Sequence, residues 1–171
     1  MRQLEQWGWQ WSRWYKGERG EYWFLAQALG IVVFFLLPVH PVVSSLAGPL
    51  PVKWGLNAVA AVLGLVAVVF MGKGLLDLGQ SLTPLPYPRE DGQLVTSGLY
   101  SVVRHPLYSG LCLAMVAWII ATLSWPHLLW AAIVIAILLR KARLEEQWLE
   151  RKYPEYSEYR RQVKQLIPWI W

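Results

Sequence analysis

The chain has 171 residues, of which 56% are hydrophobic and 16% are charged, a balance outside the range of ordinary soluble domains. It favours a single membrane domain, and the net charge of +5 does not indicate nucleic acid, because the basic residues flank apolar runs where anionic lipid is the expected neighbour. The single cysteine, Cys112, excludes an internal disulfide and a cysteine-rich metal site, and we expect no metal.

Residues 1–21 contain no apolar core followed by a small-residue cleavage site, so we expect no removable signal peptide. On a helix, Leu4 would share one face with Trp7, Trp11 and Trp14. Such an amphipathic segment is typical of the membrane interface, where we place it. A hydrophobic slot for a lipid chain is the alternative for these tryptophans.

Four apolar runs are candidates for membrane spans: residues 22–37, 54–76, 107–123 and 125–139. A span needs roughly 20 apolar residues, with about 17 as a practical lower limit, so the first and fourth runs are short. Flanking tryptophan, lysine and arginine side chains extend them to the interface. A break at Ser124-Trp125-Pro126 predicts an antiparallel hairpin of the last two runs. The predicted fold class is all-α, an integral membrane protein with about four transmembrane helices.

The basic residues are distributed unevenly between the two ends of these predicted spans. Four precede the first run, three lie from Lys73, near the end of the second run, to Arg104, and eight follow the fourth, which makes 15 of the 16. Only Lys53 falls at the other end. The positive-inside rule then places both termini and the middle loop in the cytoplasm, with any active site beside them. We expect the membrane to be the bacterial inner membrane.

The middle loop, residues 77–106, differs from its surroundings. Pro84, Pro86 and Pro88 exclude a regular helix, and Asp91-Gly92 is a turn signal. Loops of this length without secondary structure are usually functional or disordered, and the apolar and aromatic residues here argue against disorder. We predict that the loop forms a lid or a pocket wall.

Residues 140–171 follow the fourth run and are predicted to begin as a cytoplasmic extension of its helix. Leu144, Trp148 and Leu149 recur at helical spacing. Pro154 ends this helix, and the tail after Pro168 is expected to return toward the interface.

A polar cluster lies directly before the third run, in the stretch "RHPLYSG". Pro106 suits the first position of a helix, where its missing N–H group costs nothing, so Arg104 and His105 would lie at the mouth of that helix. The free backbone N–H groups of a helix start favour an anionic ligand. The simpler interpretation is that Arg104 is an interfacial anchor and His105 a polar residue at a helix end.

A second polar cluster follows the fourth run and comprises Arg140, Arg143, Glu145 and Glu146. A tight hairpin brings this end of the fourth helix beside the start of the third. The two clusters together predict a polar binding site at the membrane surface. The alternative for the glutamates is a solvated helix face balanced by Lys141 and Arg143.

The two segments "GLYSVVRHPLYSG" and "RLEEQWLERKYPEYSEY" resemble the isoprenylcysteine carboxyl methyltransferase family and its relatives, which include phospholipid methyltransferases. The resemblance covers roughly residues 78–159 and combines RHPxYxG with a pair of glutamates and with the downstream tyrosines Tyr156 and Tyr159. It implies an integral membrane enzyme that uses S-adenosylmethionine without a Rossmann domain.

The resemblance also implies two sets of site residues. The cofactor-binding set is His105, Pro106, Tyr108 and one of Glu145 or Glu146. The substrate-facing set is Arg104 and one arginine before the glutamates, Arg140 or Arg143. Methyl transfer cancels charge and mainly requires that the two partners are positioned and water is kept out.

The resulting functional hypothesis is an S-adenosylmethionine-dependent membrane methyltransferase. Its first expected reaction is carboxyl O-methylation of a prenylated or otherwise lipophilic acid at the cytoplasmic face, so the partner is a lipid or a lipid-modified substrate. Three alternatives stay open: amine N-methylation of a phospholipid, an NADPH-dependent membrane reductase of the same fold group, and a non-catalytic membrane partner protein.

Overall fold

The computed structural model describes residues 14–41, 50–168 and 170 of the chain. These residues form helices and no β-strand, which confirms the predicted all-α class. The four long helices are α2 (Glu21–Leu36), α3 (Leu50–Leu78), α4 (Pro106–Thr122) and α5 (Trp125–Lys152). The short elements are η1 (Trp14–Lys16), η2 (Gly79–Ser81), η3 (Gly98–Ser101) and α6 (Tyr156–Gln162). Residues 1–13, which carry most of the predicted interfacial segment, lie outside the described part, as do Trp169 and Trp171.

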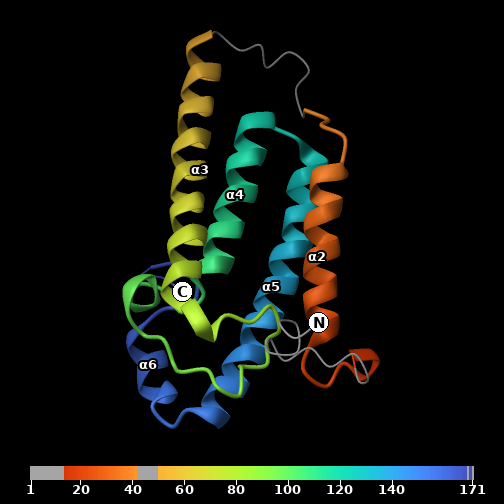
Figure 1. Ribbon diagram of the computed structural model, residues 1–171. Helices are drawn as coiled ribbons and strands as arrows, with labels where there is room; N and C mark the ends of the chain where they lie inside the picture. Colours follow the sequence, from red (N-terminus) through yellow and green to blue (C-terminus); the bar gives the residue numbers. More distant parts are fainter. Residues whose placement is uncertain (1–13, 42–49, 169, 171) are drawn as a thin grey trace.

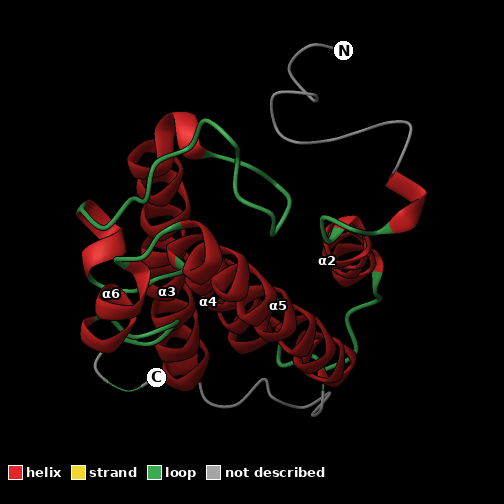
Figure 2. Ribbon diagram, turned by 90° about the horizontal axis from the view of Figure 1, so that it is seen from below, coloured by secondary structure: helices red, strands yellow, loops and turns green. Residues whose placement is uncertain are grey.

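The long helices lie side by side in an order that differs from their order in the chain (Figure 1). α3 packs against α4, α4 against α5, and α5 against α2. The view along the bundle shows the same arrangement (Figure 2). α2 therefore pairs with the last long helix rather than with its successor in the sequence.

The boundaries of α4 and α5 follow from proline and from one left-handed residue. Pro106 opens α4 at a position where no N–H donor is needed. Leu123 ends α4 in the left-handed region (φ 49°), and Ser124 is extended before α5 begins, which gives the hairpin turn. α5 ends at Lys152, two residues before Pro154.

The turn between α4 and α5 is fixed by hydrogen bonds within the turn and to His40, in the segment that follows α2. Ser124 Oγ lies 2.7 Å from Nδ1 of the buried His127, and it accepts a hydrogen bond of 3.2 Å from the backbone N–H of His40. The indole of Trp130 donates to the carbonyl oxygen of Gly30 at 2.8 Å, farther along α2. Side-chain packing continues this contact in a core of five buried residues: Phe34, Met115, Ala131, Val134 and Leu138.

α3 and α4 approach each other closely at Gly110. A Cβ atom at this position would lie 2.6 Å from Met71 Cγ and 3.0 Å from the carbonyl oxygen of Ala67. The contact therefore requires a residue without a side chain. It holds the start of α4 against α3, and with it the residues that precede Pro106.

One described helix, Val52–Ser81, is long and apolar enough to cross a bilayer. Only 17% of its most apolar stretch is buried, so its apolar surface is not covered by other described residues. α2 and α4 are also apolar but are shorter, with 16 and 17 residues.

The loop between α3 and α4 and the short helix α6 lie together at one end of the bundle, at the bottom of Figure 1. The C-terminal end and the start of α2 lie at the same end. Seen along the bundle, the loop extends from α3 toward α2 (Figure 2).

Candidate functional site

A cavity of about 520 Å³ opens at the end of the bundle that holds the loop. Residues from α2, α3, α4, α5 and α6 line it, and the loop contributes residues 81–84, 86, 88, 89 and 92–95. The loop that the sequence predicts as a lid or pocket wall therefore does line this cavity. A volume in this range, roughly 300–1,000 Å³, suits a small-molecule ligand.

The segment before α4 is held in place by the C-terminal tail. The backbone N–H of Arg104 donates to the carbonyl oxygen of Lys164 at 2.8 Å, and that of His105 donates to Gln165 at 3.1 Å. Ser109, one turn into α4, donates through its hydroxyl to the carbonyl oxygen of Leu166 at 2.7 Å. These bonds fix where Arg104 and His105 stand relative to the mouth of the cavity.

Glu146 forms the centre of a buried charge cluster beneath the cavity wall. Its carboxylate lies 2.8 Å from Arg104 Nη2, 3.0 Å from His105 Nε2 and 3.0 Å from Gln165 Nε2, and Glu146 is only 4% exposed. Burial alone would raise the pKa of Glu146, but the hydrogen bond with His105 and the charges of His105 and Arg104 lower it to about 2. Glu146 is thus held as a carboxylate and is not among the residues that line the cavity.

Glu145, its neighbour in the chain, faces the cavity instead. It accepts a hydrogen bond of 2.8 Å from the Tyr108 hydroxyl, and its carboxylate lies 3.8 Å from His105 Nδ1. The rings of His105 and Tyr108 stack at 5.2 Å and are nearly parallel. Successive helical residues are about 100° apart, so one glutamate reaches the buried cluster and the other the cavity.

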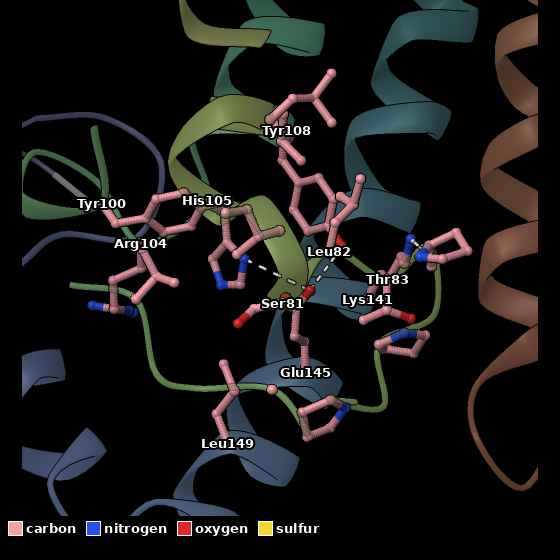
Figure 3. Close-up of a pocket in the computed structure, with 18 of the residues that line it drawn as sticks. Ser81, Leu82, Thr83, Tyr100, Arg104, His105, Tyr108, Lys141, Glu145 and Leu149 are labelled. Atoms are coloured by element: carbon pink, nitrogen blue, oxygen red, sulfur yellow. Dashed lines mark hydrogen bonds and ion pairs between the residues drawn. The ribbon is translucent and has the colours of Figure 1, made fainter. Parts of the chain in front are cut away.

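Figure 3 shows these side chains around the cavity, with His105, directly before α4, and Tyr108 from α4 converging on Glu145 from α5. The structure thus brings Arg104, His105, Tyr108 and Glu145 together on the cavity lining. Pro106 is buried at the start of α4 and sets its position. Arg140 and Arg143 have exposed side chains and do not line the cavity.

Lys141 lines the cavity, although the sequence pattern predicts for it only a charge that balances the two glutamates. It is 3% exposed, and its ammonium donates to Gln27 Oε1 at 2.7 Å and to the carbonyl oxygen of Pro84 at 2.9 Å. The spacing of Lys141, Glu145 and Leu149 puts all three on one side of α5. This four-residue repeat was the signal that could have identified Lys141.

Tyrosines from the C-terminal part complete the wall of the cavity. Tyr153 donates to the carbonyl oxygen of Gly92 at 2.6 Å, and Tyr159 donates to that of Tyr100. Tyr156 is 1% exposed and lines the cavity, yet its hydroxyl has no hydrogen-bond partner among the described residues. Burial and the charge of Glu146 raise the pKa of Tyr156, so its hydroxyl keeps its proton and can donate to a ligand.

An apolar groove continues from the cavity along α2 and α4. This second hollow, of about 200 Å³, shares Ile31, Phe35, Leu111 and Ala114 with the first. Phe34, Met115 and Trp118 complete its walls. The cavity therefore has a polar end beside the loop and an apolar end within the bundle.

Comparison with known proteins relates the chain to one family and to named relatives. Residues 56–156, from α3 to the start of α6, match the phospholipid methyltransferase family. A methanethiol S-methyltransferase of Pseudomonas deceptionensis is 33% identical over 116 residues, which are 67% of this chain and 42% of the relative. A methanethiol S-methyltransferase of Crocosphaera subtropica is 41% identical over 76 residues, which are 44% of this chain and 29% of the relative. The matches thus cover less than half the length of either relative.

Proposed function

Since the chain belongs to the phospholipid methyltransferase family, we propose that its cavity binds S-adenosylmethionine and serves methyl transfer to a lipophilic acceptor. Methyltransferases of this group take their methyl group from S-adenosylmethionine, and the resemblance seen in the sequence is confirmed at the level of the family. The observation that carries the proposal is the meeting of His105, Tyr108 and Glu145 on one cavity wall.

The residues present fit this group. S-adenosylmethionine supplies, when bound, a methyl group on a positively charged sulfur. Glu145 offers a carboxylate on the cavity lining to a cationic ligand, and the Tyr156 hydroxyl, which has no partner among the described residues, offers a donor to a ligand oxygen or nitrogen. The loop lines one side of the cavity, where it would keep water away from the reacting groups.

The proposed roles differ among the predicted site residues. His105, Tyr108 and Glu145 hold the cofactor, and Pro106 sets the start of α4 beside it. Arg104 lines the cavity, but its guanidinium is engaged by Glu146 and by the carbonyl oxygens of Arg160 and Val163, so we assign it to shaping the site. The exposed Arg140 and Arg143 have no part in this proposal.

The acceptor is proposed to reach the cavity from the bilayer through the apolar groove between α2 and α4. A prenylated or otherwise lipophilic acid is one candidate for the acceptor. A lipophilic thiol is a second candidate, because the named relatives are methanethiol S-methyltransferases. Phospholipid amines are the alternative within the family. The apolar groove supports all three equally, because it contacts only the hydrocarbon part of an acceptor.

We further propose that α2, α3, α4 and α5 all cross the membrane, with the cavity at the cytoplasmic end. The four helices alternate in direction, so the start of α2, the end of α5 and the loop share one end. Of the basic residues that the structure describes, all but Lys53 belong to the segments at that end. Exposed apolar side chains on α2, α3 and α5 support contact with lipid: Leu29, Phe35, Leu65, Leu76, Leu128 and Leu129.

The test is a titration of the detergent-purified protein with S-adenosylhomocysteine, by calorimetry. We expect saturable binding, weakened at least about tenfold in Glu145→Gln, where a charged hydrogen-bond partner is lost. Glu158→Gln, on the exposed face of α6, is the matched control and should bind as the wild type does. Absence of saturable binding would overturn the proposal, and saturable binding of NADPH in its place would support the reductase alternative.

A further inference from the structure

The cavity carries two opposite charges on successive turns of α5. Glu145 carries a carboxylate and Lys141 an ammonium group, and both side chains line the cavity. The other cations on the lining, Arg89 and Arg104, are each paired with a carboxylate, Asp91 at 2.7 Å and Glu146 at 2.8 Å. Lys141 has no such partner: among the described residues, no carboxylate lies within 4 Å of its ammonium.

The two oxygens that Lys141 contacts are both neutral. They belong to the Gln27 amide and the Pro84 carbonyl, and the faces of Phe24 and Tyr108 lie 5.7 and 5.4 Å from the ammonium. A buried ammonium that lacks a counter-ion is costly, since neutral dipoles replace only part of its hydration. Burial accordingly lowers the pKa of Lys141, and the more distant charge of Glu145 opposes that shift.

The position of Lys141 along α5 separates it from the cofactor-binding residues. It lies one helical turn before Glu145, and its partner Gln27 lies one turn before Ile31, which lines both the cavity and the apolar groove. Lys141 therefore stands where the polar end of the cavity meets its apolar end. A lipophilic acceptor with its chain in the groove would present its reacting group there.

We propose that Lys141 binds the reacting group of the acceptor and restricts the acceptor to groups that react as anions, a thiolate or a carboxylate. This inference rests on the proposed function. An acceptor lone pair forms the new bond to the methyl carbon as the bond from that carbon to sulfur breaks and leaves its electron pair on sulfur. A carboxylate needs no deprotonation, and a thiol first releases its proton to water, which a neighbouring ammonium favours by lowering the thiol pKa. An amine bound as its ammonium form is repelled by Lys141.

The test uses three acceptors of equal chain length: decanethiol, decanoate and decylamine. We expect the wild-type protein to methylate decanethiol or decanoate and not decylamine. Lys141→Met keeps the length of the side chain and removes its charge, and it should weaken decanoate binding to the protein saturated with S-adenosylhomocysteine by at least about 30-fold. Lys141→Arg retains the charge and should stay within about tenfold of the wild type.

Lys141 also contacts the loop through the Pro84 carbonyl, and Lys152→Met is the matched control for the loss of such a loop contact. Lys152 also lies on α5 and donates to two loop carbonyls, those of Arg89 and Glu90, but it does not line the cavity. If Lys141 acted only by tethering the loop, Lys152→Met would reproduce the loss of decanoate binding. We expect Lys152→Met to bind decanoate as tightly as the wild type does.

Each outcome bears on one of the two proposals. Undiminished decanoate binding in Lys141→Met, or methylation of decylamine in preference to both anions, would overturn the role of Lys141. The titration with S-adenosylhomocysteine does not depend on the acceptor. Absence of saturable S-adenosylhomocysteine binding to the wild-type protein would therefore overturn the methyltransferase proposal separately. The binding assay decides the question for Lys141 even if none of the three acceptors is methylated.

Discussion

The guanidinium of Arg104 lies 2.8 Å from the carboxylate of Glu146, and both side chains are almost fully withdrawn from solvent. This ion pair joins the segment before α4 to α5 across the hairpin, directly beneath the cavity. The position of His105 and Tyr108 on the cavity wall thus depends on a charge that does not face the cavity.

Replacement of Glu146 by glutamine should destabilise the protein strongly. The substitution leaves the Arg104 guanidinium buried without a counter-charge, a change that typically costs about 3–5 kcal/mol. Thermal unfolding in detergent measures the effect. Glu158→Gln, which affects an exposed carboxylate on α6, is the control and should change the free energy of unfolding by less than about 0.5 kcal/mol. Equal shifts in the two variants would contradict the assignment.

Stability should depend on pH through the same carboxylate. The pKa of Glu146 is about 2 in the folded protein and 4.5 without the fold, so its contribution is complete above about pH 4.5 and is lost as the pH falls toward 2. The difference corresponds to about 3 kcal/mol. The gap in free energy of unfolding between the wild type and Glu146→Gln should therefore shrink between pH 5 and pH 3 in denaturant titrations. A gap that stays constant would refute this role, because the other acids are common to both proteins.

Tyr156→Phe should separate stability from ligand binding. The unliganded variant should be as stable as the wild type or more so, since a buried hydroxyl without a partner costs about 1–3 kcal/mol. Its affinity for S-adenosylhomocysteine should fall by about three- to tenfold, as one neutral hydrogen bond is lost. Thermal midpoints with and without the ligand test both statements, with the exposed Tyr15→Phe as control. Unchanged affinity would mean that the hydroxyl does not contact the ligand.

Two glycine-to-alanine changes should have opposite effects on the bundle. Gly110→Ala places a methyl group against the α3 backbone and should destabilise by about 1–3 kcal/mol. Gly64→Ala, on α3, meets no atom within 4 Å and should be neutral or stabilising by up to about 1 kcal/mol, because alanine favours helix. The comparison is made by thermal unfolding in the same detergent. A destabilised Gly64→Ala would show that this face of α3 is covered in the assembled protein.

The positions of the long helices could be predicted because local signals define them. Pro106 marks the start of α4, and the break at Ser124-Trp125-Pro126 separates α4 from α5. Apolar run length indicated α2 and α3 in the same way. The number of membrane crossings needs more than these signals, because among the described helices only the one over Val52–Ser81 is long and apolar enough by its own composition.

Other parts of the site depend on contacts between distant segments and left no local signal. Nothing near Lys164 and Gln165 indicates that their carbonyl oxygens accept from Arg104 and His105, some 60 residues earlier. Glu145 faces the cavity and Glu146 the buried cluster because of how α5 is rotated about its axis. The residue types alone do not determine this rotation. The Tyr156 hydroxyl is of interest because it has no hydrogen-bond partner among the described residues, and this is a property of the packed structure.

The pairing of α2 with α5 has a consequence for how the chain is assembled during synthesis. A ribosome makes α2 first, but its partner surface, with Trp130 and Val134, follows about 100 residues later. In the interval α3 and α4 can pair as neighbours in the sequence, while the apolar surface of α2 has to be shielded until α5 is made. Substitutions in the contact between Gly30 and Val134 should therefore lower the yield of inserted protein before they affect catalysis, because completion of the bundle is the last and longest-range step.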